Sequence, residues 1–140
     1  MKAFKTSKAI LASPQAVFDA FSNRDLLAEW WGPAGFTNTF DIFEFKNGGT
    51  WSFVMHGPDG RHYENESQFI EIIAAKKVVI CHLSEPKFTL TITIKDKGAG
   101  SIIYWAQAFD NAEVASRIAH IIEPSNEQNL NRLAAVVCAN

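Results

Sequence analysis

From residue 36 to residue 109 the apolar side chains recur at every second position, and this alternation limits the fold more than any other feature of the chain. A period of two places successive side chains on opposite faces of a β-strand, whereas an amphipathic helix needs a period of about 3.6. The segment KFTLTITIK, residues 87–95, shows the pattern most clearly, because its apolar residues alternate with threonines. Such segments predict antiparallel strands with one buried face and one face in water.

Turn residues divide this region into six predicted strands. The pair Gly48-Gly49, the GPDG stretch at 57–60 and the DKGAG stretch at 96–100 are rich in residues that tight turns favour. In the first of these six strands, residues 36–45, the apolar parity shifts between Phe40 and Phe43. This shift predicts a β-bulge, because a bulge changes the face that later residues occupy. The six strands are expected at residues 36–45, 50–56, 61–69, 76–84, 87–95 and 101–109.

The segments before this region predict one strand and two short helices. Residues 3–11 fit a first strand. Ser13 is expected to be a helix N-cap with Pro14 as the first helical residue, which is a common arrangement. A second helix is predicted at residues 24–31, with Asn23 as its cap and the following Gly-Pro pair as its end.

The C-terminal tail returns to a helical period. Residues 112–122 are expected to form an irregular helical segment, which Pro124 interrupts. Ser125 and Gln128 resemble a capping box that starts a new helix. That helix carries an apolar stripe at positions i, i+3, i+4 and i+7, made of Leu130, Leu133, Ala134 and Val137. It is the segment expected to cover the buried face of the sheet.

The bulk composition is that of an ordinary globular domain. With 140 residues, 47% apolar and 20% charged, the chain suits a single domain over residues 1–140. A net charge of −2 and the lack of a basic cluster argue against a nucleic-acid surface. No apolar stretch approaches the roughly 20 residues of a membrane span. The cysteines Cys81 and Cys138 form no CxxC pair, and the N-terminus has no apolar run typical of a signal peptide, so a cytoplasmic location is expected.

The predicted order of elements, β-α-α-β6-α, resembles the helix-grip fold of the START-like or SRPBCC superfamily. This fold class is α+β, with a curved antiparallel sheet wrapped around a long C-terminal helix. Four segments are similar to one branch, the relatives of the C-terminal domain of the activator of the heat-shock-protein-90 ATPase, whose single-domain bacterial members are often labelled polyketide-cyclase-like. These segments are ASPQAVFDAF, LLAEWWGPAGF, NGGTWSFVMHGPDG and NLNRLAAVV.

The chain departs from this resemblance in two places. Asn47 stands where proline is common in the family, and residues 110–124 are irregular. In relatives the second region gates the mouth of the cavity, so the resemblance does not carry over the size of a ligand.

The concave interior that this fold implies is either a filled core or the wall of a ligand cavity. Both alternatives are open, because large aromatic rings can pack solid or line a pocket. Tyr63, Asn65, Ser67 and Gln107 point into the interior by parity, and each needs a partner there: a side chain, water or a ligand. The candidate ligand-binding residues are Trp31, Phe43, Phe45, Trp51, Phe53, Met55, Tyr63, Asn65, Ser67, Phe69, Trp105, Gln107, Leu130 and Leu133.

Three functions fit these features. The preferred one is binding of a small hydrophobic or amphipathic ligand between sheet and terminal helix. The resemblance also implies a cochaperone-like protein-interaction module, which ranks lower because the expected single domain does not include the extra N-terminal domain of full-length activators. The third is a polyketide-cyclase-like enzyme, for which His82 and Glu71 are the candidate acid–base residues.

No catalytic motif is present, and the histidines lack the spacing of metal ligands, so no catalytic residue, cofactor or metal is expected. Of the adjacent Trp30 and Trp31, one is expected in the core and the other at the rim of the cavity. Exposed aromatic surface near residues 30–36 would support a homodimer.

Overall fold

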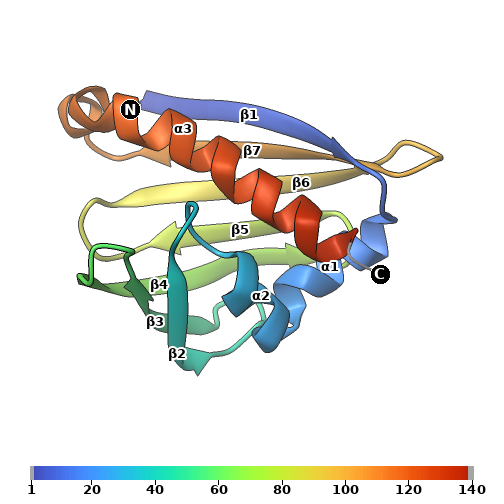
Figure 1. Cartoon of the computed structure of the whole chain (residues 1–140), viewed down its shortest axis with the longest axis horizontal. Coiled ribbons are helices and arrows are strands. Elements are labelled where there is room, and N and C mark those ends of the chain that lie inside the picture. Colours follow the sequence, from blue (N-terminus) through green and yellow to red (C-terminus); the bar gives the residue numbers. More distant parts are fainter. Residues whose placement is uncertain (1, 139–140) are drawn as a thin grey trace.

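The computed structural model describes residues 2–138 and contains one seven-stranded sheet with three helices (Figure 1). The elements in chain order are β1 (Lys2–Ile10), α1 (Pro14–Ser22), α2 (Arg24–Trp30), β2 (Thr37–Phe43), β3 (Thr50–His56), β4 (His62–Ile73), β5 (Lys77–His82), β6 (Phe88–Asp96), β7 (Ser101–Phe109) and α3 (Ala112–Val137). This is the predicted order, and the α+β helix-grip fold is confirmed.

The sheet is curved, antiparallel throughout and unclosed, with strand order β1-β7-β6-β5-β4-β3-β2. Strand β1 pairs with β7 at one edge of the sheet, and β2 pairs with β3 at the other. The first two strands of the chain therefore form the two edges of the sheet. Helix α3 runs obliquely across one face of the sheet, and α1 and α2 lie beside its C-terminal half (Figure 1). The N-terminal half of α3 is therefore the half that faces the sheet with no helix beside it.

The two short helices begin where the capping residues predict. The Ser13 side chain accepts a hydrogen bond from the backbone N–H of Ala16, and Asn23 caps α2 in the same way. Helix α2 ends one residue earlier than predicted, because Trp31 already has extended backbone angles. Gly32 follows with φ +98°, a conformation that favours glycine.

The prediction of two helical segments at the C-terminus is wrong: α3 is continuous from Ala112 to Val137, with Pro124 inside it. Asn111, rather than Ser125, caps this helix. Proline removes one backbone N–H from a helix interior, but packing on both sides of Pro124 offsets that loss. Ala115 packs with one apolar cluster at the N-terminal end, and Leu130 with the main core further along.

The bulge predicted in the second strand is confirmed, between Phe40 and Ile42. A second, unpredicted bulge lies between Phe69 and Glu71. It bends β4 and lets the strand continue to Ile73, beyond the predicted end at residue 69.

Candidate ligand-binding site

One end of the space between sheet and helices is packed solid with aromatic rings. The Trp51 indole stacks on Phe69, with ring centroids 5.6 Å apart and planes 7° from parallel. Phe45 meets the edge of Phe69 at 5.1 Å, and Phe43 lies 5.9 Å from Phe45. Trp51 and Phe69 are at most 1% exposed. These rings, with α1 and α2 beside them, form a filled core.

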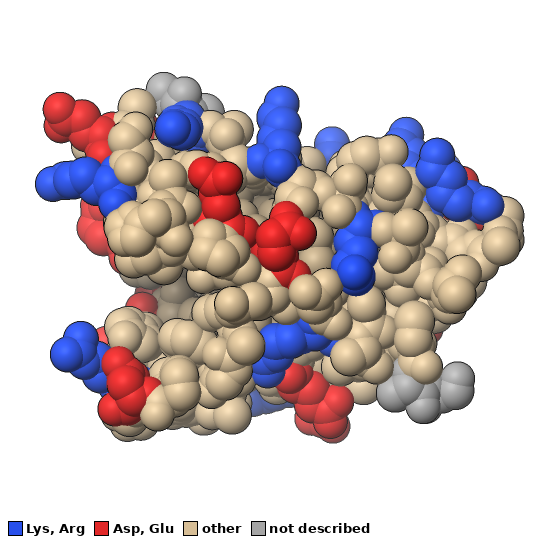
Figure 2. Space-filling model, turned by 45° about the horizontal axis from the view of Figure 1, so that its top comes forward, with Lys and Arg blue, Asp and Glu red and all other residues tan. Residues whose placement is uncertain are grey.

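The other end of the same space is hollow. A cavity of about 670 Å³ lies between β3–β7, the middle of α3 and the loop from α2 to β2. Figure 2 shows the molecule hollowed on this side, between the region of α3 and the region of the β3–β4 hairpin. The apolar lining consists of Trp31, Pro33, Phe36, Phe53, Met55, Tyr63, Ile80, Pro86, Phe88, Leu90, Trp105, Ile121 and Ile122. The polar lining consists of Asn65, Ser67, His82, Gln107, Ser125, Asn126 and Asn129, with Gly32, His62, Glu64 and Glu85 completing the wall.

The structure therefore divides the fourteen predicted ligand-binding residues into two groups. Eight line the cavity: Trp31, Phe53, Met55, Tyr63, Asn65, Ser67, Trp105 and Gln107. The other six do not line it and belong to the packed core instead: Phe43, Phe45, Trp51, Phe69, Leu130 and Leu133. Strand parity placed the eleven strand residues among them on the concave side, but parity does not show which end of that side is filled.

The adjacent tryptophans serve different ends of this interior. Trp30 is fully buried, and its indole N–H donates to the carbonyl oxygen of Ala20 at 2.9 Å. Trp31 is 8% exposed and lies between the two halves, 4.9 Å from the Trp51 ring and 5.9 Å from Trp105. Trp30 therefore packs in the core and Trp31 forms a cavity wall.

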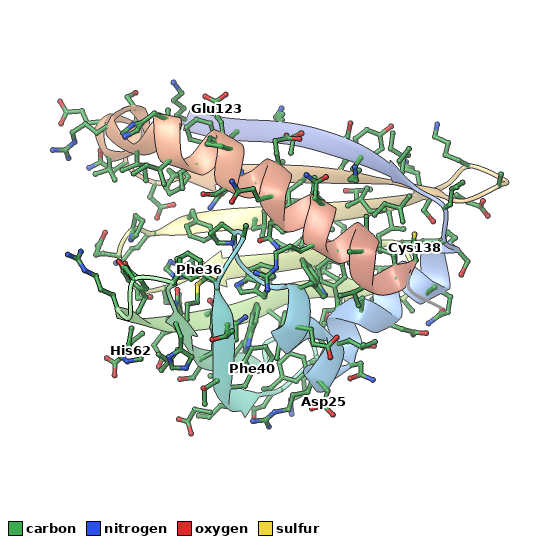
Figure 3. The ribbon with its side chains drawn as sticks, viewed as in Figure 1. Asp25, Phe36, Phe40, His62, Glu123 and Cys138 are labelled. Atoms are coloured by element: carbon green, nitrogen blue, oxygen red, sulfur yellow. The ribbon has the colours of Figure 1, made fainter. Side chains whose placement is uncertain are left out.

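A loop from Gly32 to Phe36 covers the cavity, and α3 holds this loop in place. We call it the roof loop; Figure 3 labels Phe36, its last residue, beside α3. The side chain of Asn129 on α3 accepts from the Gly32 N–H at 3.3 Å and donates to the Trp30 carbonyl at 3.0 Å. Arg132, one turn further, donates to several carbonyl oxygens of the same segment. The roof is thus fixed by two polar side chains of α3 that lie outside its apolar stripe.

His82 is the one histidine whose ring is buried against the cavity wall. It stacks on Phe88 with ring centroids 4.5 Å apart. Its Nδ1 donates to the carbonyl oxygen of Pro86 at 2.9 Å, while Nε2 lies 2.6 Å from Asn65 Oδ1 and 3.3 Å from Ser84 Oγ. In this arrangement both ring nitrogens face oxygen atoms that accept, which suits the protonated ring. The neutral ring fits once the Asn65 amide is turned so that its NH2 group donates to Nε2, with the Ser84 hydroxyl as a second donor.

Burial decides between these two forms. Desolvation lowers the pKa of His82 below its ordinary value of 6.5, although hydrogen bonds to the backbone at Pro86 and Ser84 and the negative charge of Glu85 oppose the shift. The neutral ring is therefore the main form near neutral pH. Glu71, the other predicted acid–base residue, lies elsewhere and pairs with Lys77 at 2.8 Å.

A second polar group joins α3 to the sheet across the cavity. The Asn126 side-chain amide donates to Gln107 Oε1 on β7 at 3.1 Å, and both residues are at most 9% exposed. Asn126 and Asn129 lie inside the helix predicted to start at Ser125, but the apolar stripe of that helix does not include them. Their spacing of three residues places them on one face of that helix.

The described residues show no cluster of three or more potential metal ligands. The closest histidine pair is His56 with His62, whose Nδ1 atoms lie 2.6 Å apart at the outer end of β3 and β4. Within residues 2–138, no helix has the length and apolar character needed to cross a membrane.

Comparison with known proteins places the chain in a structural context. Residues 11–137 match the family model described as "Activator of Hsp90 ATPase homolog 1-like protein". A solution structure of a protein from Arthrobacter aurescens has a TM-score of 0.89 at 21% identity, with 99% of this chain and 87% of that chain covered. A crystal structure from Nitrosomonas europaea has a TM-score of 0.88 at 14% identity, with coverages of 96% and 93%.

A third structure, the AHSA1 protein from Silicibacter pomeroyi, has a TM-score of 0.78 at 18% identity and covers 99% of both chains. At these identities the likeness to solved structures shows a shared fold alone. No curated protein matches the chain.

Proposed function

The chain belongs to the activator of Hsp90 ATPase homolog 1-like family, and from that premise we propose that it binds a small apolar or amphipathic molecule in the cavity between the sheet and α3. One observation carries this proposal. Large rings fill one end of the interior, yet equally large rings at the other end surround a space of about 670 Å³. That volume falls within the range of about 300–1,000 Å³ typical of pockets for small molecules.

The chemistry of the wall supports the same function. Protein interiors are normally close-packed, so an apolar space of this size loses dispersion contacts that a ligand would restore. Rigid rings such as Trp31, Trp105 and Phe88 provide flat apolar surface, while a few amide and hydroxyl groups can orient a polar group on the ligand. The roof loop is pinned by α3, so the wall is largely preformed.

A pair of substitutions on one strand tests the proposal. Leu90 lines the cavity, whereas its neighbour Thr91 points to the other face of β6. Leu90→Trp should fill the cavity and weaken the binding of small apolar molecules by about tenfold or more. Titration calorimetry measures this change. Thr91→Trp adds the same side chain outside and should bind like the parent. Equal binding by both variants and the parent would place the ligand elsewhere.

Two other functions predict different results. A cochaperone-like module, suggested by the family description, would capture an Hsp90-type chaperone in a pull-down, and Leu90→Trp would not affect that capture. A polyketide-cyclase-like enzyme would turn over its substrate, and His82→Gln would abolish turnover without abolishing binding. Ligand binding without either behaviour is the result that the proposal expects.

A further inference from the structure

The charges around the cavity limit which ligands can enter it. Among the described residues that line it there is no lysine or arginine. The lining carboxylates are Glu64, whose side chain faces outward by strand alternation, and Glu85, which is exposed in the β5–β6 loop. His82 adds little positive charge near neutral pH, because burial lowers its pKa. An anionic group drawn into this cavity would therefore lose its hydration without meeting a positive charge.

Arg132 does not supply a positive charge to an anionic ligand in the cavity. Its guanidinium lies behind the roof loop and donates to the backbone carbonyls of Glu29, Trp31, Gly32, Pro33 and Phe36. These hydrogen bonds commit its donors to the protein itself. The burial of an unpaired carboxylate is costly, so ligands of the fatty-acid type are disfavoured.

The polar groups in the wall disfavour a cation as well. Gln107 Oε1 is occupied by Asn126, while Gln107 Nε2 has no hydrogen-bond partner among residues 2–138. The Ser67 hydroxyl, on a residue 2% exposed, also makes no hydrogen bond to a described residue. On the same face of β7, two positions from Gln107, the buried indole N–H of Trp105 lacks a partner in the described part of the chain. Gln107 Nε2 is thus a free N–H donor in this wall, and an ammonium group, which only donates, cannot satisfy it.

We propose that the cavity selects uncharged amphiphiles with a hydroxyl or carbonyl oxygen, and that this oxygen accepts a hydrogen bond from Gln107 Nε2. The apolar part of such a molecule would lie against the rings of Trp31, Phe53, Phe88 and Trp105. Alcohols, ketones, esters and amides with an apolar body belong to this class. This inference rests on the proposed function, since it specifies the ligand of the same cavity.

Three probes of equal chain length test the selection by charge: decanol, decanoate and decylamine, titrated calorimetrically near neutral pH and below their micelle concentrations. Decanol should bind at least about tenfold more tightly than either charged probe. The carboxylate of decanoate would meet no positive charge, and the ammonium group of decylamine would leave Gln107 Nε2 without an acceptor. Equal affinity for decanol and decanoate would overturn the selection while leaving ligand binding intact. If no probe binds, the proposed function and this inference both fail.

Substitutions at Gln107 test its role as the anchor. Gln107→Leu should weaken decanol binding by about tenfold, since the variant removes the donor. Gln68→Leu is the matched control: it makes the same change on β4 outside the cavity, and it should bind decanol normally. Unchanged decanol binding by Gln107→Leu would overturn the assignment.

A second variant keeps the test valid if Gln107→Leu does not fold. Gln107→Glu keeps the shape and retains an acceptor for Asn126, but it replaces the free donor by a carboxylate oxygen. This variant should shift the preference from decanol to decylamine. A variant that still prefers decanol over decylamine would contradict the anchoring role.

Discussion

Arg132 Nη1 donates to the carbonyl oxygen of Gly32 at 2.9 Å, and this contact fastens the long C-terminal helix to the roof of the cavity. The same guanidinium reaches the carbonyls of Glu29 at 2.7 Å and Phe36 at 2.9 Å. Carbonyls at the end of α2 and in the following loop have no helical partners, so one side chain satisfies groups that would otherwise be left unpaired. The roof and the cavity below it therefore depend on a residue that does not line the cavity.

Replacement of Arg132 should loosen the roof. Arg132→Met keeps much of the apolar stem but removes every donor, and we expect it to lower the free energy of unfolding by about 2–3 kcal/mol. Arg132→Lys keeps the charge but has no planar fork, so it should fall between Met and the parent. Urea denaturation measures the difference. Parent-like stability of Arg132→Met would show that these hydrogen bonds contribute nothing.

The two ends of the interior should respond differently to truncation. Phe69 lies in the packed core at 1% exposure, and Phe69→Ala should cost about 3–5 kcal/mol, as for other buried phenylalanines. Phe88 borders the cavity and is only partly buried, so Phe88→Ala should cost less, about 1–2 kcal/mol. Unfolding in urea compares both. Equal losses would mean that the region around Phe88 is as well packed as the core.

Acidification should destabilise the protein partly through His82. Its pKa is lowered from 6.5 by burial, so the unfolded chain binds more protons than the folded one as the pH falls through 6.5. The stabilisation from the neutral ring is present above 6.5 and is lost as the pH falls toward the pKa of the folded state. The free energy of unfolding, measured at about pH 7.5 and about pH 5.5, should fall less for His82→Gln than for the parent. An identical fall in both would exclude this contribution.

Pro124 should limit the stability of α3. A proline inside a helix lacks the N–H that would bond to the carbonyl four residues earlier, at His120. Pro124→Ala should therefore raise the free energy of unfolding by about 1–3 kcal/mol, observed as a higher thermal midpoint. The same change at an exposed loop proline, Pro58→Ala, serves as the control and should have little effect. A lower midpoint for Pro124→Ala would show that the proline is required for the packing of α3.

The alternation of apolar residues was sufficient to predict the sheet, because strand parity is a local property that burial of one face imposes. The caps at Ser13 and Asn23 were predictable for the same reason, since each bonds to backbone groups within three residues. The continuity of α3 through Pro124 was not predictable in this way. It depends on contacts of Ala115 and Leu130 with strands far away in the sequence.

The candidate site was only half predictable. Parity placed Phe53 and Phe69 on the same side of the sheet, but the space near Phe69, beside α1 and α2, is filled, whereas that near Phe53 is open. Which end is hollow depends on where the helices cross the sheet, and a strand pattern does not contain that information. Asn126 and Asn129 were not predicted as site residues, because their partners, Gln107 and the roof loop, are distant in the sequence.

Intermolecular nuclear Overhauser effects between bound decanol and the protein test the central claim most directly, because they report which side chains touch the ligand. We expect contacts from the alkyl chain to Trp31, Leu90 and Trp105, and none to Trp51 or Phe69. Contacts confined to the outer surface, or none to Trp31 and Trp105 at saturating decanol, would contradict a ligand cavity between the sheet and α3.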